Sequence, residues 1–198
     1  MKDYYDTRAP EYDEWYLGQG RFAGLRRPHW DEDLRELVEL IAALPAKPTL
    51  DVACGTGFLS RHLRGEVTLV DQSERMLTIA RERLPGWPAV RGDALELPFA
   101  DDSFDRVFTA HLYGHLEARD REPFLTEARR VAPELLVIDA ARRPDHEAEE
   151  WQERELNDGS RFEVYKRFFT GSELAEEIGG GTVLLANHWF VAVASPRA

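Results

Sequence analysis

The sequence predicts an α/β fold in which a doubly wound, mostly parallel sheet ends in an antiparallel C-terminal hairpin. Three observations lead to this prediction. Short apolar runs alternate with amphipathic stretches over residues 46–140, as in strand–helix units that pair in parallel. A glycine turn follows the first apolar run, where such sheets bind ligands. The segment TVLLANHWFVAVAS (182–195) is typical of two strands joined at Asn187.

The elements follow in order along the chain. A helix is expected between Pro28 and Pro45, because apolar residues recur there at helical spacing. Strands are expected at 49–53, 66–71, 88–94, 104–110 and 135–140, with helical segments at 58–63, 73–84 and about 119–131. Further on, 161–169 is predicted to be extended, and TGSELAEEI (170–178) opens with a capping box. The polar stretch 146–160 is predicted to be a surface helix followed by a turn, with a lid as a further possibility.

Composition limits the class of protein. The 198 residues are 43% hydrophobic, which suits one domain over 1–198. The net charge of −12 argues against a nucleic-acid partner, which requires a basic face. Cys54 is the only cysteine, so no intramolecular disulfide can form and a reducing compartment is expected. No apolar run is long enough to span a membrane, and we therefore expect a cytoplasmic protein.

The glycine turn lies in LDVACGTGFLS (50–60) and distinguishes between cofactors. Gly55 and Gly57 allow a close backbone approach, but Ser60 stands where a dinucleotide fingerprint has its third glycine. Asp51, in the strand before the turn, would repel a pyrophosphate and would suit an ammonium group. The turn therefore favours a cationic ligand without phosphates.

Two further acids complete the pattern. Asp71 ends the second strand, where a carboxylate can bind ribose hydroxyls, and Asp93 ends the third, where it can accept from an adenine amine. Alone, Asp51 could be a strand-ending acid and Asp71 a helix cap before Ser73. Together the three acids describe a ligand with an amine, a ribose and an adenine, which is S-adenosylmethionine.

The chain resembles the class I S-adenosylmethionine-dependent methyltransferases, in the small branch that includes the ubiquinone and menaquinone biosynthesis enzymes. The matching segments are LDVACGTG, VTLVDQSERML, RGDALELPFADDSFDRVF and YYDTRAPEYDEWY, within residues 4–140. The resemblance implies a Rossmann-like seven-stranded sheet. It also implies N-terminal cap helices over 1–45, a cofactor-binding core over 46–140, and an acceptor-side segment with the closing hairpin over 141–198.

The resemblance implies a role for each matching residue. Asp51 would organise the methionine end of the cofactor, Asp71 the ribose, and Asp93 with the Ala94 amide the adenine. Tyr12 would cover the methionine carboxylate, with help from Tyr4 or Tyr5. The expected cofactor-binding residues are Tyr12, Asp51, Ala53, Cys54, Gly55, Gly57, Asp71, Gln72, Met76, Asp93, Ala94 and His111. The sequence departs from the family at Ala53, where glycine is usual, and in the short connection before 135–140.

The acceptor side carries a weaker pattern. HLYGH places His111, Tyr113 and His115 after the fourth strand, where either histidine could act as a general base or simply pack. In RFEVYKRFF, Tyr165, Arg167 or Phe168 could line the acceptor pocket or be ordinary strand packing. No local base accompanies Cys54, so a nucleophilic role is not expected, and no spacing predicts a metal site.

These observations predict methyl transfer from S-adenosylmethionine to the oxygen, nitrogen or carbon of a small-molecule acceptor, with S-adenosylhomocysteine as product. One alternative is a nicotinamide-dependent oxidoreductase, which Ser60 and Asp51 disfavour. Another is a non-catalytic subunit that binds S-adenosylmethionine and supports a partner. The protein is expected to be a monomer or homodimer, and the sequence leaves the acceptor open.

Overall fold

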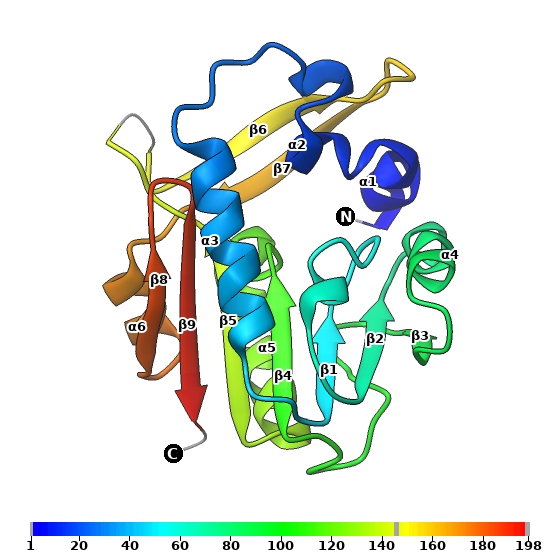
Figure 1. The fold of residues 1–198 in the computed structure, drawn as a ribbon, viewed down its shortest axis with the longest axis vertical. Helices are drawn as coiled ribbons and strands as arrows, with labels where there is room; N and C mark the ends of the chain where they lie inside the picture. The colour runs from blue at the N-terminus through cyan, green and yellow to red at the C-terminus, as the bar shows by residue number, and fades with distance from the viewer. Residues whose placement is uncertain (1, 145–146, 197–198) are drawn as a thin grey trace.

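The computed structural model describes residues 2–144 and 147–196, and it confirms the doubly wound α/β fold (Figure 1). Seven strands form one sheet in the order β3-β2-β1-β4-β5-β9-β8. The first five strands pair in parallel, β9 runs antiparallel to β5, and β8 runs antiparallel to β9. Their bounds are β1 Thr49–Val52, β2 Val67–Asp71, β3 Ala89–Arg91, β4 Arg106–Ala110, β5 Glu134–Ala140, β8 Thr182–Ala186 and β9 Phe190–Pro196.

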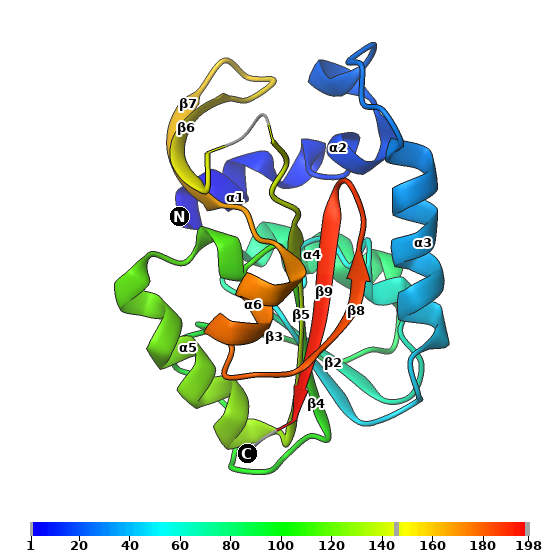
Figure 2. The ribbon, with the colours of Figure 1, turned by 90° about the vertical axis from the view of Figure 1, so that its left-hand side faces the viewer.

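Helices cover both faces of this sheet. Figure 2 shows α5 (Ala118–Val131) and α6 (Gly171–Glu177) on one face and α3 (Trp30–Ala43) on the other. α4 (Glu74–Arg83) shares an apolar cluster with α3, and α5 and α6 share a separate cluster on the opposite face. The predicted capping box of α6 is confirmed, since Thr170 and Glu173 cap each other reciprocally. Apolar periodicity predicted α3, α4 and α5, and the capping box predicted α6.

The direction of strand addition reverses between β1 and β4, which lie side by side at the centre of the sheet. Strands β2 and β3 extend the sheet to one side of β1, and β4 and β5 extend it to the other. The crevice at the carboxyl ends of such a pair is where open α/β sheets bind ligands. The fold thus identifies this end of β1 and β4 as the place to look for a site.

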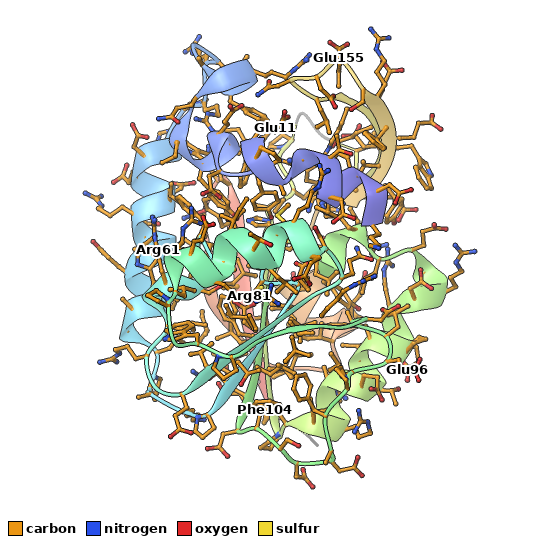
Figure 3. All side chains as sticks on the ribbon, turned by 90° about the vertical axis from the view of Figure 1, so that its right-hand side faces the viewer. Glu11, Arg61, Arg81, Glu96, Phe104 and Glu155 are labelled. Carbon is orange, nitrogen blue, oxygen red and sulfur yellow. The ribbon has the colours of Figure 1, made fainter. Side chains whose placement is uncertain are left out.

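A second layer covers the carboxyl ends of the parallel strands (Figure 1). It consists of an N-terminal segment and a two-stranded hairpin. Its elements are α1 Lys2–Arg8, η1 Ala9–Glu11, α2 Glu14–Leu17, η2 Gly20–Phe22, β6 Glu149–Glu155 and β7 Arg161–Arg167. The two parts touch where Glu11 accepts a hydrogen bond from the Asn157 amide at 2.7 Å. Glu11 and Glu155 both lie in this layer (Figure 3).

The predicted surface helix in 146–160 is wrong, because this stretch forms β6 and the turn into β7. Antiparallel pairing runs from Glu149 opposite Arg167 to Glu155 opposite Arg161. The turn is set by Gly159, which has φ +85°, and by the Asp158 carboxylate, which accepts from the Ser160 amide at 2.9 Å. Residue 146 lies outside the described residues.

The helical segment expected at 58–63 is reduced to a single 3-10 turn, η3 Ser60–His62. The Leu63 amide donates to the Ser60 carbonyl at 2.8 Å, which closes the tight turn. A second 3-10 turn, η4 Tyr113–His115, follows β4. In the part of the chain that the structure describes, no helix has the length and apolarity needed to cross a bilayer.

Candidate functional site

The glycine turn after β1 has left-handed backbone at both glycines, with φ +56° at Gly55 and +73° at Gly57. The Gly55 amide donates to Asp71 Oδ2 at 2.9 Å, which ties the turn to the end of β2. A Cβ on Gly55 would lie 3.4 Å from the ring of Tyr12. A Cβ on Gly57 would instead lie 2.9 Å from Leu84 in the region after α4. Gly55 therefore gives access to the crevice, whereas Gly57 allows the turn to pack closely below it.

Ala53 adopts a conformation that explains the departure noted in the sequence. Its φ is +59°, in the left-handed region that glycine occupies without strain. An alanine there is disfavoured by roughly 1 kcal/mol. The glycine usual at this position thus has a backbone reason, and this chain carries local strain directly beside the crevice.

Two buried carboxyls flank the turn. Asp51 is 2% exposed and accepts a hydrogen bond from the Ser60 hydroxyl, and burial raises its pKa to about 7. Asp71 is 7% exposed and accepts from the Gly55 and Ser73 amides, and burial raises its pKa to about 6. Burial disfavours the charged form of each acid, so a cation placed between them would be stabilised by both.

The remaining predicted residues on this side follow β2 and β3. Asp93 lies in the turn after β3 and is exposed, with Oδ1 accepting from the Leu95 amide at 2.9 Å. Ala94 and Gln72 are half-buried, and Met76 is fully buried in the first turn of α4. The three acids thus lie at the carboxyl ends of three adjacent strands, as the sequence pattern requires.

The N-terminal segment is pinned over the glycine turn by two sets of polar contacts. Asp13 accepts from the Thr56 hydroxyl at 2.5 Å and from Arg83. Asp6 accepts from the Ser73 hydroxyl at 2.5 Å. The space enclosed between Tyr12 and Asp51 is only about 10 Å³, roughly the volume for one water. A larger ligand at the turn therefore requires this segment to move outward.

A much larger cavity of about 430 Å³ lies on the other side of Tyr12, between the N-terminal segment and the β6–β7 hairpin. Its volume is in the range of small-molecule sites. The wall combines aromatic rings with charged side chains. Its lining includes Tyr4, Tyr5, Arg8, Tyr12, Trp15, Tyr16, His111, His115, Arg154, Lys166 and Phe168. The cavity and the glycine turn thus share Tyr12 as a common wall.

His111 and His115 both line this cavity. His111 has φ +61°, and its Nε2 is buried with no hydrogen-bond partner in the described part of the chain. Its Nδ1 lies 3.9 Å from Asp139 Oδ1. His115 Nδ1 lies 2.7 Å from the Tyr165 carbonyl, which can only accept, so Nδ1 carries the proton and Nε2 keeps a lone pair.

Burial lowers the pKa of both histidines, and for His115 the neighbouring cations Lys166 and Arg154 add to the effect. Both rings are therefore neutral at pH 7. A neutral ring with a free lone pair can accept a proton, although a lowered pKa makes it a weak base. Geometry allows this role for His115 Nε2, whereas His111 Nε2 lies in a buried setting against Trp15 and Phe190.

Asp139 and Lys166 form a buried ion pair that the sequence analysis did not assign to the site. Lys166 Nζ lies 2.5 Å from Asp139 Oδ1, and Asp139 also accepts from the Gly114 amide at 2.7 Å. Burial opposes the ionisation of Asp139, but Lys166 and His111 beside it hold its pKa well below the usual range. The pair fixes η4, and with it His115, against β7.

The residues expected on the acceptor side lie mostly elsewhere. Tyr113 is 1% exposed and packs against Phe124 and Phe169 in the core. Tyr165 donates to Glu149 at 2.6 Å, and Arg167 pairs with Glu149 and Glu177. None of these three lines the cavity.

Strand periodicity explains where Tyr165 and Arg167 lie. Successive side chains of a strand point to opposite faces, so Lys166 and Phe168 face the cavity while Tyr165 and Arg167 face away. Phe168, also considered from the sequence, does line the cavity. The useful signal was Lys166, a cation in the same period-two register as Val164 and Phe168. Arg8 and Arg154 carried no comparable local signal.

Cys54 is the only cysteine, and its Sγ lies 3.6 Å from the Gly55 carbonyl. Burial raises the pKa of this thiol well above its ordinary value. It is therefore held as a neutral thiol beside the turn and is not activated as a nucleophile. Over residues 2–144 and 147–196, no group of three or more histidine, cysteine, aspartate or glutamate side chains is placed to hold a metal ion.

Comparison with known proteins gives a consistent result. Residues 50–134 match the family model described as a methyltransferase domain. The demethylmenaquinone methyltransferase of Thermotoga maritima is 40% identical over 102 residues, covering 49% of this chain and 44% of that protein. The ubiquinone/menaquinone biosynthesis C-methyltransferase of Paracoccus denitrificans is 36% identical over 124 residues, covering 54% of this chain and 48% of that protein. The chain thus spans about half the length of these relatives.

Among solved structures, the DhpI–SAH complex is 29% identical and superposes with a TM-score of 0.76 over 98% of this chain and 94% of that chain. The magnesium protoporphyrin IX methyltransferase of Synechocystis is 15% identical with a TM-score of 0.63, which shows a common fold. The resemblance noted in the sequence and the Rossmann-like fold that it implied are both confirmed.

Proposed function

We propose that this chain, which resembles the class I S-adenosylmethionine-dependent methyltransferases in fold and across residues 50–134, is itself a methyltransferase acting on a small molecule. The observation that carries the proposal is the set of Asp51, Asp71 and Asp93 at three adjacent strand ends around a left-handed glycine turn. The DhpI–SAH complex shares the fold over nearly the whole chain. The comparisons favour neither the nicotinamide-dependent nor the non-catalytic alternative.

The donor chemistry of the crevice fits S-adenosylmethionine. Burial raises the pKa values of Asp51 and Asp71, and the charged form of Asp51 would be stabilised by an ammonium group and that of Asp71 by hydroxyl donors. Asp71 would hold the ribose, while Asp93 and the Ala94 amide would bind the adenine beside Met76 and Gln72. Once the N-terminal segment moves outward, the side of Gly55 that Tyr12 now covers would admit the methionine end.

Bound S-adenosylmethionine supplies an activated methyl group on a sulfonium centre. The chain's own contribution is to position the acceptor and to exclude water, because direct transfer depends mainly on alignment. Tyr12 forms the wall between the glycine turn and the large cavity, so a donor on one side and an acceptor on the other would meet at this ring. The N-terminal segment would close over both.

A proton acceptor is needed only if the acceptor group arrives protonated. His115 lines the cavity and its Nε2 keeps a lone pair, and we assign it this role. His111 would then be a positioning residue that holds Asp139, Trp15 and Tyr16 in place around the cavity. The backbone carbonyl of Tyr165 would fix the His115 tautomer that leaves Nε2 available.

The remaining expectations belong to the same proposal. They are a single domain over 1–198, a monomeric or homodimeric state and a cytoplasmic location, the last supported by the single cysteine, which allows no intramolecular disulfide. The net charge of −12 continues to argue against nucleic acid as the acceptor.

Calorimetric titration of the purified chain with S-adenosylmethionine and, separately, with NAD tests the reaction class. The proposal predicts saturable one-site binding of S-adenosylmethionine and no saturable binding of NAD. Saturable NAD binding by a folded chain that does not bind S-adenosylmethionine would instead support the oxidoreductase alternative.

A further inference from the structure

The large cavity is rich in positive charge although the chain as a whole is strongly acidic. Its charged wall residues are Arg8, Arg21, Arg143, Arg154 and Lys166, against Glu11 and Glu155. The net charge of the whole chain is −12. A methyl donor with a sulfonium centre gains nothing from a cationic wall, so this feature calls for a separate explanation.

Ion pairs within the protein neutralise part of this charge. Arg21 pairs with Glu155 at 3.0 Å, and Lys166 pairs with Asp139 at 2.5 Å. In the described part of the chain, by contrast, neither Arg8 nor Arg154 has a carboxylate partner. The only hydrogen-bond acceptors of Arg8 and Arg154 in the described structure are thus uncharged side chains.

Arg8 and Arg154 converge on a single phenol oxygen. Arg8 Nη1 donates to Tyr4 Oη at 2.6 Å, and Arg154 Nη1 donates to the same atom at 3.1 Å. Arg154 also donates to the side-chain carbonyl of Gln152 at 2.7 Å. The two guanidinium groups come from segments far apart in sequence, and the fold places them against one another without an intervening acid.

Arg8 is the more deeply buried of the two. It is 9% exposed, and its guanidinium carbon lies 5.5 Å from the ring of Tyr4 and 5.0 Å from the ring of Tyr12. A guanidinium has five N–H donors, yet Arg8 makes one side-chain hydrogen bond in the described structure. A buried cation without an anion is unfavourable, and the arrangement would be completed by an oxyanion.

We propose that Arg8 and Arg154 form an oxyanion-binding site, and that the methyl acceptor carries a carboxylate or phosphoryl group held there. The identification of the bound molecule as the acceptor rests on the proposed function; the site itself does not. Tyr5, Trp15 and Phe168 supply apolar wall for the rest of the molecule. The acceptor is therefore a small anion with an apolar body.

The carboxylate of the cofactor is another oxyanion that could occupy this site. Arg8 and the glycine turn contact the same Tyr12 ring, so a cofactor bound at the turn would lie only one ring away from Arg8. The two sources are distinguished by saturating the protein with S-adenosylhomocysteine before adding the probe. An acceptor site still binds an added oxyanion under these conditions. A site for the cofactor carboxylate is already filled and does not.

The probes are benzoate and phenylphosphonate, with benzamide as the neutral match, titrated by calorimetry in low-salt buffer. We expect one site for at least one of the anions on the S-adenosylhomocysteine-saturated protein, with benzamide about tenfold weaker or worse. Relative affinity for benzoate and phenylphosphonate identifies the oxyanion. Equal affinity for benzamide, or displacement of the anions by S-adenosylhomocysteine, overturns the proposal.

Variants locate the site. Arg154→Gln should weaken anion binding by about tenfold, and Arg8→Gln should do the same if it folds. Arg119→Gln, which removes an exposed arginine on α5, is the matched control for the change in net charge and should leave binding unchanged. Equal loss in the Arg119 and Arg154 variants contradicts a local site. If S-adenosylhomocysteine does not bind but Arg154-dependent anion binding persists, the proposed function fails and the oxyanion site stands.

Discussion

Ala53 and His111 both adopt left-handed backbone, with φ +59° and +61°, immediately after the adjacent strands β1 and β4. The strain thus lies on both sides of the point where the sheet reverses its direction of growth. Such conformations persist where the surrounding structure requires them, and they concentrate at functional sites. In this chain they lie at the start of the glycine turn and at His111, which lines the large cavity on the other side of Tyr12.

The strain at Ala53 predicts that Ala53→Gly stabilises the protein by about 0.5–1 kcal/mol, because glycine adopts this φ without a steric penalty. The free energy of unfolding from urea denaturation measures the effect. Ala42→Gly, on the exposed face of α3, is the matched control and should destabilise by about 1 kcal/mol. Destabilisation of the same size in both variants would show that the backbone at Ala53 is not strained.

The raised pKa values of Asp51 and Asp71, about 7 and about 6, predict how cofactor binding depends on pH. An ammonium group favours the ionised carboxylates, so below these values binding must release protons. The dissociation constant for S-adenosylhomocysteine should fall severalfold from pH 5 to pH 7, continue to fall to about pH 8, and level off above. Asp51→Asn should bind more weakly at pH 8 and show a flatter profile. A wild-type affinity that does not vary between pH 5 and 7 contradicts the assignment.

The contacts of Asp13 predict how fast the cofactor enters. Asp13 holds the N-terminal segment to Thr56 and Arg83 across the turn. Asp13→Ala should therefore raise both the association and dissociation rates of S-adenosylhomocysteine by about two- to tenfold. Stopped-flow fluorescence can follow the change through Trp15, which lies in this segment. Rates unchanged from wild type would mean that entry does not require this segment to open.

The free lone pair of His115 predicts a selective loss of turnover. Once an acceptor with a protonated nucleophile is found, His115→Asn should lower kcat by about 10²-fold or more, while affinity for S-adenosylhomocysteine stays within about twofold. His188→Asn changes an exposed histidine outside the cavity and serves as the control. Full turnover by the His115 variant would exclude this ring as the base.

Much of the fold was predictable because its signals are local. Apolar runs marked the parallel strands, and Thr170 with Glu173 marked the start of α6. The acids also followed from position alone, because parallel strands end at one edge of the sheet. Even the departure at Ala53 could be located, although its left-handed backbone could not.

The rest could not be predicted because it depends on contacts between segments that are distant in the sequence. β6 alternates between solvent and a polar cavity, so both of its faces carry charged or polar residues and no apolar alternation marks it as a strand. The inward face of β7 depends on its register with β6, and without that register Tyr165 could not be distinguished from Lys166. The pairing of Arg8 with Arg154 through Tyr4 joins distant segments and has no local trace.

The central claim is that Asp71 holds the cofactor, and calorimetric titration with S-adenosylhomocysteine tests it most directly. Wild type is compared with Asp71→Asn, and Asp31→Asn, a change at an exposed residue of α3, is the control. Thermal melts establish that each variant is folded. The account predicts one-site binding by wild type and the Asp31 variant, and at least a tenfold loss in Asp71→Asn. Equal affinity in all three proteins, or no binding by folded wild type, would contradict it.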